Sequence, residues 1–351
     1  MVNINLLFGQ AAHVKKMHGT ASPPYARGFH ERCRRYKLLL IPPLIAGVYL
    51  NAKDTYQKIL VELKKHISGD ESVLELMFIT LIADGHTLLE GVPGVAKTTM
   101  TKALADTIAA DFKRIQGTPD VGPSDIVGYT FLNQENQVQV SKGPVFTNIL
   151  LFDELNRTQP RVMSSLLETL EERQVTLGGT TMDLPKPFNA FATQNPLRIE
   201  GTEPLPKVLA DRFLMRIPVD YPSREEEGMM IRIKEAEEKI VVNKVIGTSE
   251  ILELQESAKS VILPDDVKDY ITGIVSETRK SIHIVMGASP RADISFMKCG
   301  KAKALIEGRD KVTIGDIKFL ARPVLSHRLA VRSTGGIGVN GIIDGIIATY
   351  S

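Results

Sequence analysis

His86-Thr-Leu-Leu-Glu-Gly-Val-Pro-Gly-Val-Ala-Lys-Thr-Thr99 is the stretch of the chain that decides the fold. It begins with a short apolar run, 87–89, that predicts a buried strand, and it continues into a glycine loop from Gly91 to Ala96. Residues that suit a buried face then recur at helical spacing from Met100 to Ile108. The order strand, glycine loop, Lys-Thr and helix is that of a phosphate-binding loop, G-x-x-x-x-G-K-[ST].

This loop predicts a site for the phosphates of a nucleotide. Its backbone N–H groups would wrap a di- or triphosphate, and the helix N-terminus would add a favourable dipole. Lys97 would reach the terminal phosphates, and the hydroxyl of Thr98 would hold Mg²⁺. The candidate nucleotide-binding residues are Gly91, Val92, Pro93, Gly94, Val95, Ala96, Lys97, Thr98 and Thr99.

Ala96 departs from the general pattern, which has a glycine at this position. Alanine carries the smallest side chain with a Cβ. We therefore expect the loop to close only if Ala96 avoids a strongly positive φ.

A second apolar strand, Asn148-Ile-Leu-Leu-Phe-Asp-Glu154, ends in two acids. A strand that is apolar on both faces suits a parallel sheet, and ligands of open α/β sheets gather at the carboxyl ends of the strands. Asp153 is therefore a candidate Mg²⁺ ligand, and Glu154 a candidate for activating a water molecule. The alternative is an acidic cap before the next helix, but the spacing from Lys97 suits two strands of one sheet.

Strands and helices alternate from about residue 51 to 220, which predicts a doubly wound parallel α/β domain. We expect helical structure to begin near Lys53, and two hairpins to lie at 131–140 and 175–184. From 221 to 351 the pattern is helical only, with start signals such as the Thr313 capping box. The sequence therefore predicts a smaller all-α domain after the α/β domain.

Residues 1–50 show no sustained period and carry seven Lys/Arg against one Glu, whereas the whole chain has a net charge of +2. We expect a poorly ordered basic extension or a mis-assigned start, and contact with nucleic acid or anionic lipid is the alternative. The apolar run 38–50 is interrupted by Pro42-Pro43 and is too short for a membrane span, which needs about 20 residues.

The composition is that of an ordinary globular protein, with 43% hydrophobic and 24% charged residues among 351. A net charge close to neutral gives no indication of a nucleic-acid partner. Cys33 and Cys299 are isolated, so neither a disulfide framework nor a Cys-x-x-Cys metal site can form. This cysteine usage fits a cytoplasmic location.

The chain resembles the AAA+ ATPases, and within them the MoxR family, from about Gly69 to its end. The resemblance is carried by several motifs in order: the phosphate loop, Lys-Gly-Pro-Val-Phe-Thr-Asn-Ile-Leu-Leu-Phe-Asp-Glu-Leu-Asn-Arg, Ala-Thr-Gln-Asn-Pro, Gly-Thr-Glu-Pro-Leu-Pro, Asp-Arg-Phe and Gly-Ala-Ser-Pro-Arg-Ala. Ala-Lys-Thr resembles the MoxR variant of the loop, and the two hairpins resemble the additional hairpins of this branch. The resemblance implies an AAA+ P-loop domain followed by a helical lid.

The resemblance also implies roles for three further residues. Asn195 matches sensor 1, whose amide would orient the attacking water together with Glu154. Arg212 matches the arginine finger, which would reach the γ-phosphate bound by a neighbouring subunit; the alternative is a salt bridge at a helix end. Arg291 matches sensor 2, which would touch the nucleotide from the first turn of a lid helix.

The function implied is that of a hexameric, ATP- and Mg²⁺-dependent ATP hydrolase that remodels, matures or inserts cofactors into partner proteins. A partner with a von Willebrand factor A domain is expected from the same resemblance. A nucleic-acid motor is the first alternative, but the hairpin tips 133–136 and 178–181 hold no Lys or Arg, so nucleic acid is not the expected partner. A metal-chelatase motor subunit is the second alternative, and it would share every catalytic residue.

Overall fold

The computed structural model describes residues 42–67, 70–92, 94–195, 203–235, 241–332 and 338–350. The chain divides into two units, 1–46 and 47–351, and the described residues lie almost wholly in the second unit. The prediction of a poorly ordered extension over 1–50 therefore falls mostly outside the described residues.

The first described helix, α3, spans Pro42–Lys64. The predicted start near Lys53 is wrong, because Pro42 and Pro43 stand in the first turn of the helix. Proline is tolerated there, since the first N–H groups of a helix have no partner within it. None of the described helices is long and apolar enough to cross a membrane.

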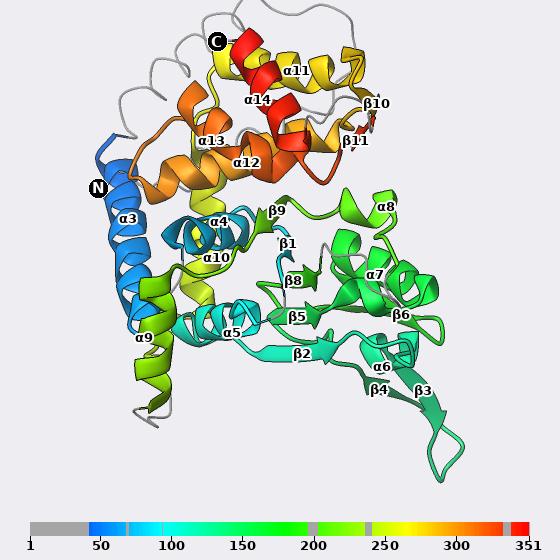
Figure 1. The fold of residues 1–351 in the computed structure, drawn as a ribbon. Helices are drawn as coiled ribbons and strands as arrows, with labels where there is room; N and C mark the ends of the chain where they lie inside the picture. The colour runs from blue at the N-terminus through cyan, green and yellow to red at the C-terminus, as the bar shows by residue number, and fades with distance from the viewer. Residues whose placement is uncertain are drawn as a thin grey trace, which may run out of the picture. The chain divides into compact units, whose positions relative to one another are not determined.

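A parallel sheet of five strands forms the centre of the second unit, in the order β2-β5-β8-β1-β9 (Figure 1). Its strands are β1 (Thr87–Glu90), β2 (Phe112–Gln116), β5 (Ile149–Asp153), β8 (Asn189–Gln194) and β9 (Met215–Pro218). Two of them, β1 and β5, lie where the apolar runs of the sequence predicted strands, to within one residue at each end. The register pairs Gln116 with Asp153 and Glu90 with Gln194, so the carboxyl ends of four neighbouring strands meet at one edge.

Helices cover both faces of this sheet. On one face, Leu88 and Phe152 share a core cluster with Leu166 and Leu170 of α7 (Pro160–Glu172). Successive residues of a strand point to opposite faces, so Leu89 and Leu151 face the other way. On that face, α5 (Lys97–Thr107) packs against β5, and α4 (Glu71–Ile82) lies beside β9. Figure 1 shows α7 and α5 on different sides of the sheet, which confirms the predicted doubly wound fold.

Both predicted hairpins are present. The first consists of β3 (Gly128–Leu132) and β4 (Val138–Lys142), and the second of β6 (Gln174–Leu177) and β7 (Thr180–Asp183). The first hairpin follows the short helix α6 (Pro123–Val127), and Figure 1 shows it reaching beyond the sheet. The second turns at Gly178 and Gly179, which both have positive φ as a tight hairpin turn requires.

The region after β9 is mainly helical. Its elements are α9 (Arg224–Glu235), α10 (Thr248–Ser260), α11 (Asp265–Lys280), β10 (Ile284–Met286), α12 (Arg291–Ile306), α13 (Ile314–Leu325), β11 (Ala330–Val331) and α14 (Val339–Thr349). The Thr313 capping box is confirmed, because the side chains of Thr313 and Asp316 each accept the other's backbone N–H. The expectation of helices alone missed β10 and β11, which pair antiparallel. Three-residue and two-residue strands are too short to leave a period in the sequence.

Candidate functional site

The phosphate loop joins β1 to α5, as predicted. A Cβ on Gly91 would lie 2.3 Å from the carbonyl oxygen of Val219, so this position requires glycine. Val219 cannot move away easily, because its N–H donates to Glu90 at 2.7 Å. Pro93 lies outside the described residues.

The backbone conformation of Ala96 differs from the prediction. Its φ is 58° and its ψ 17°, so it adopts the left-handed conformation that the sequence analysis expected it to avoid. The φ lies in the small left-handed region that a residue with a Cβ can enter, and the ψ lies just below that region, at a cost of roughly 1–2 kcal/mol. The loop therefore closes on alanine with a modest strain.

Lys97 is buried at the first position of α5. Its Nζ donates to the carbonyl oxygens of Gly91 at 2.5 Å and Val92 at 3.0 Å. Burial lowers the pKa of Lys97, although the nearby carboxylates of Asp153, Glu154 and Glu90 act to raise it. The ammonium group therefore lies within the loop, beside the acids at the sheet edge.

The carboxylate of Asp153 accepts hydrogen bonds from three side chains. Its Oδ2 accepts from Thr98 Oγ1 at 3.0 Å and from Arg114 at 2.7 Å, and its Oδ1 accepts from Thr193 Oγ1 at 2.7 Å. Burial raises the pKa of Asp153, but these hydrogen bonds outweigh burial and leave the pKa below its usual value. An ionised carboxylate beside a threonine hydroxyl is an oxygen donor set that suits Mg²⁺.

Glu154 follows in a left-handed conformation, with φ at 54°. Its backbone N–H donates to Thr193 Oγ1 at 2.8 Å. Its carboxylate accepts from Gln116 Nε2 at 3.0 Å and pairs with Arg157 Nε at 3.2 Å. The side chain is thus held by neighbours on β2 and on the short helix that follows β5.

A cavity of about 400 Å³ gathers most of the predicted residues at the carboxyl ends of the strands. Asn195 closes one side of it, and its carbonyl accepts from Asn156 at 3.3 Å. The cavity is lined by Gly91, Gly94, Val95, Ala96, Lys97, Thr98, Thr99, Arg114, Gln116, Asp153, Glu154, Thr193 and Asn195.

Three of these lining residues were missed by the sequence analysis. Gln116 is the last residue of β2, Arg114 lies two residues before it, and Thr193 lies near the end of β8. Gln116 also accepts from Arg114 at 2.7 Å, so the two form one network with the acids. The signal that could have found Gln116 is its place at the carboxyl end of a parallel strand, because ligands of open α/β sheets gather at that edge.

Arg212 and Arg291 do not line this cavity. They lie together at a second cavity of about 350 Å³, where both pair with the carboxylate of Glu171 on α7. Arg212 approaches one oxygen of Glu171 at 2.6 Å and also donates to the carbonyl of Val208 at 2.6 Å. Arg212 therefore does form the salt bridge that the sequence analysis weighed as the alternative, and Arg291 is not brought to its own phosphate loop.

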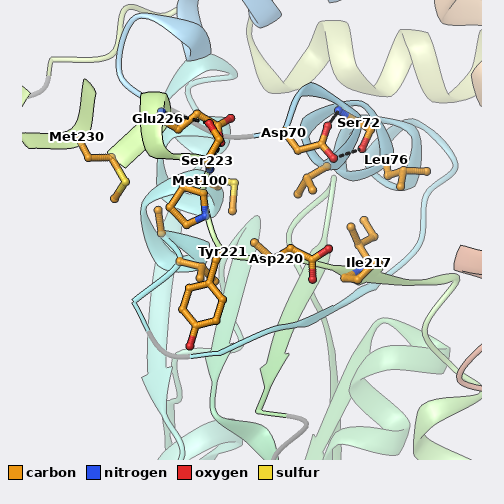
Figure 2. Close-up of a pocket in the computed structure, with 16 residues that line it drawn as sticks. Asp70, Ser72, Leu76, Met100, Ile217, Asp220, Tyr221, Ser223, Glu226 and Met230 are labelled. Carbon is orange, nitrogen blue, oxygen red and sulfur yellow. Dashed lines mark hydrogen bonds between the residues drawn. The ribbon is translucent and has the colours of Figure 1, made fainter. Parts of the chain in front are cut away.

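A third cavity, also about 350 Å³, adjoins the phosphate loop and shares Val95 and Ala96 with it (Figure 2). Its walls are largely apolar and come from α4, α5 and the segment that leads from β9 to α9. Figure 2 shows Leu76, Met100 and Ile217 around the space, with Tyr221 at its edge. An apolar slot beside a phosphate loop suits a flat, weakly polar group that is attached to the phosphates.

Comparison with known proteins agrees with this geometry. Residues 86–215 match the ATPase family associated with various cellular activities (AAA), and residues 276–336 match the AAA lid domain. The chain is 44% identical over 263 residues to the uncharacterized protein YeaC of Bacillus subtilis, covering 74% of this chain and 82% of that protein. It is 39% identical over 287 residues to the chaperone MoxR1 of Mycobacterium tuberculosis, covering 79% and 76%.

Among solved structures, a crystal structure of a presumed ATPase from Cytophaga hutchinsonii superposes with a TM-score of 0.80 at 37% identity, over 86% of this chain and 96% of that one. The fold, the phosphate loop and these relatives agree. The chain belongs to the MoxR family of AAA+ ATPases.

Proposed function

We propose that this AAA+ ATPase binds ATP with Mg²⁺ in the cavity at the sheet edge and couples its hydrolysis to the remodelling of partner proteins. The observation that carries the proposal is the convergence of Lys97, Thr98, Asp153, Glu154 and Asn195 on one cavity. Phosphoryl transfer to water depends almost entirely on positioning and charge neutralisation, and these five side chains supply both.

Each residue has a distinct task in this proposal. The loop amides and Lys97 bind the phosphates, and Thr98 and Asp153 hold Mg²⁺, which neutralises charge on the β- and γ-phosphates. Glu154 accepts the proton of the attacking water, which Asn195 orients. The hydrogen bonds from Gln116 and Arg157 must loosen before Glu154 can turn to that water. The nucleoside lies in the apolar cavity around Met100.

The active site is completed by a second subunit in this proposal. Arg212 lies away from its own phosphate loop, and its salt bridge to the half-exposed Glu171 is one that it can exchange for a phosphate. An arginine supplied in this way is worth roughly 10³–10⁵ in rate. We therefore expect a ring, hexameric as the family resemblance implies, that acts in the cytoplasm on a partner with a von Willebrand factor A domain.

Mixing two inactive variants tests the shared site. Arg212→Ala subunits retain a working loop, and Lys97→Ala subunits retain Arg212. Each variant alone should release almost no phosphate, while mixed rings should recover activity wherever Lys97→Ala presents Arg212 to a working loop. Absence of recovery at every ratio, after subunit exchange has been verified, would make Arg212 a structural residue.

A further inference from the structure

Arg328 is a buried arginine of the lid region, 4% exposed, in the segment between α13 and β11. Its Nε donates to Asp211 Oδ1 at 2.9 Å, and its two terminal nitrogens donate to the carbonyls of Phe213 at 2.8 Å and Leu214 at 3.1 Å. The remaining N–H groups are satisfied by Val324 and by Ser295 Oγ. All five N–H donors of the guanidinium are therefore used, and three of them hold the segment 211–214, which contains Arg212.

The residues beside Arg328 bind the same part of the chain. Ser326 Oγ accepts from Arg216 at 3.0 Å, and His327 Nε2 lies 3.0 Å from the carbonyl of Phe213. The carbonyl of Leu329 accepts from Lys207 at 3.1 Å. Four consecutive lid residues, 326–329, thus form a clamp on the segment 207–216.

The clamp also reaches Arg291. The second carboxylate oxygen of Asp211 accepts from Ser289 Oγ at 2.8 Å, and Ser289 Oγ in turn accepts from the backbone N–H of Arg291 at 3.2 Å. Asp211 therefore links the clamp to the start of α12. One hydrogen-bond network therefore holds both the segment that contains Arg212 and the backbone of Arg291. The guanidinium groups of the two arginines both pair with the carboxylate of Glu171.

We propose that Arg328 is a positioning residue that fixes Arg212, and through Asp211 also Arg291, so that both can act on the nucleotide of a neighbouring subunit. This inference rests on the proposed shared active site. In this proposal, the lid of each subunit affects the rate of ATP hydrolysis in the neighbouring subunit and not in its own. A displacement of about 1 Å in such a group can cost roughly 100-fold in rate.

Arg328→Lys tests the proposal, because lysine keeps the charge but cannot supply five donors in a planar fork. Arg322→Lys is the matched control, since Arg322 is an exposed arginine of α13 whose ion-pair partner among the described residues is Asp344. Arg328→Lys should bind a fluorescent ATP analogue with unchanged affinity and lose roughly 100-fold in hydrolysis. Arg322→Lys should match the wild type in both.

Mixed rings separate positioning from general damage. Arg328→Lys mixed with Lys97→Ala should recover as well as the Arg212→Ala and Lys97→Ala mixture does, because the Lys97→Ala subunit supplies an intact clamp. Arg328→Lys mixed with Arg212→Ala should not recover, because neither variant presents a working arginine. Asp211→Asn, which removes the charge that Arg328 contacts, should behave like Arg328→Lys in both mixtures.

Three results would overturn the inference. The first is hydrolysis by Arg328→Lys at the wild-type rate, and the second is loss of ATP binding by Arg328→Lys. The third is that neither Arg328→Lys nor Asp211→Asn recovers ATP hydrolysis when mixed with Lys97→Ala, although Arg212→Ala does. Failure of the Arg212→Ala and Lys97→Ala mixture itself would instead remove the shared site, and this inference with it.

Discussion

Thr193→Val should damage both the stability and the turnover of this ATPase, although valine has nearly the shape of threonine. The Thr193 hydroxyl accepts the backbone N–H of Glu154 at 2.8 Å and donates to Asp153 Oδ1 at 2.7 Å. A neutral hydrogen bond contributes roughly 1 kcal/mol and one to a charged group roughly 1.5–3 kcal/mol, so we expect a loss of about 3 kcal/mol. For a chain of 351 residues, a loss of this size corresponds to a fall of roughly 4–5 °C in Tm.

The loss should depend on pH in a defined direction. The pKa of Asp153 in the folded protein lies below its usual value, and the bond from Thr193 contributes to that shift. A carboxyl of this kind stabilises the fold above its unfolded pKa of about 3.9, and the contribution disappears as the pH falls through the folded pKa. The difference in Tm between the wild type and Thr193→Val should therefore be largest near neutral pH and shrink below about pH 4.

Turnover should fall for a separate reason. Glu154 keeps a left-handed backbone, and the bond to Thr193 is what holds its N–H. Without this bond the base shifts, and kcat should drop by roughly 100-fold while KM for ATP changes little. Thr193→Ser keeps the hydroxyl and should retain most of both properties. Equal Tm and kcat for Thr193→Val and the wild type would refute the role assigned to this hydroxyl.

Three further predictions concern the loop, the hairpins and α3. Gly91→Ala should abolish ATP binding in an equilibrium binding assay, because its Cβ would lie 2.3 Å from the carbonyl of Val219, whereas Ala96→Gly should leave binding within a few-fold of the wild type. Single- or double-stranded DNA should not stimulate phosphate release, because the hairpin tips carry no Lys or Arg; a several-fold, salt-sensitive stimulation would contradict this. A chain truncated to begin at Pro42 should keep its ATPase activity, while one that begins at Lys53 cuts through α3 and should melt at a lower temperature.

Local sequence signals predicted the nucleotide-binding half of the molecule well. The phosphate loop and the Asp153-Glu154 strand end are short motifs whose chemistry depends on adjacent residues, so their positions at one sheet edge followed from the parallel-sheet rule. The conformation of Ala96 was predicted wrongly, because steric preference alone cannot show that closure of the loop outweighs a modest backbone strain.

Contacts between distant segments were the part that the sequence could not supply. Arg212 and Arg291 share Glu171, and nothing in the local sequence of any of the three predicts that meeting. The same holds for Arg328, which reaches Asp211 across more than a hundred residues of chain. Such pairs are fixed by how the lid packs on the α/β domain, and tertiary packing of this kind leaves no periodic pattern.

Glu154→Gln tests the central claim most directly, when ATP binding and phosphate release are measured on one preparation with Mg²⁺ present. Glutamine keeps the size of the side chain and removes the base, so ATP binding should match the wild type while hydrolysis falls by at least roughly 100-fold. Glu253→Gln, on the exposed face of α10, is the matched control and should change neither. Hydrolysis by Glu154→Gln at a rate near that of the wild type would contradict the assignment of the base, and with it the proposed chemistry of the site.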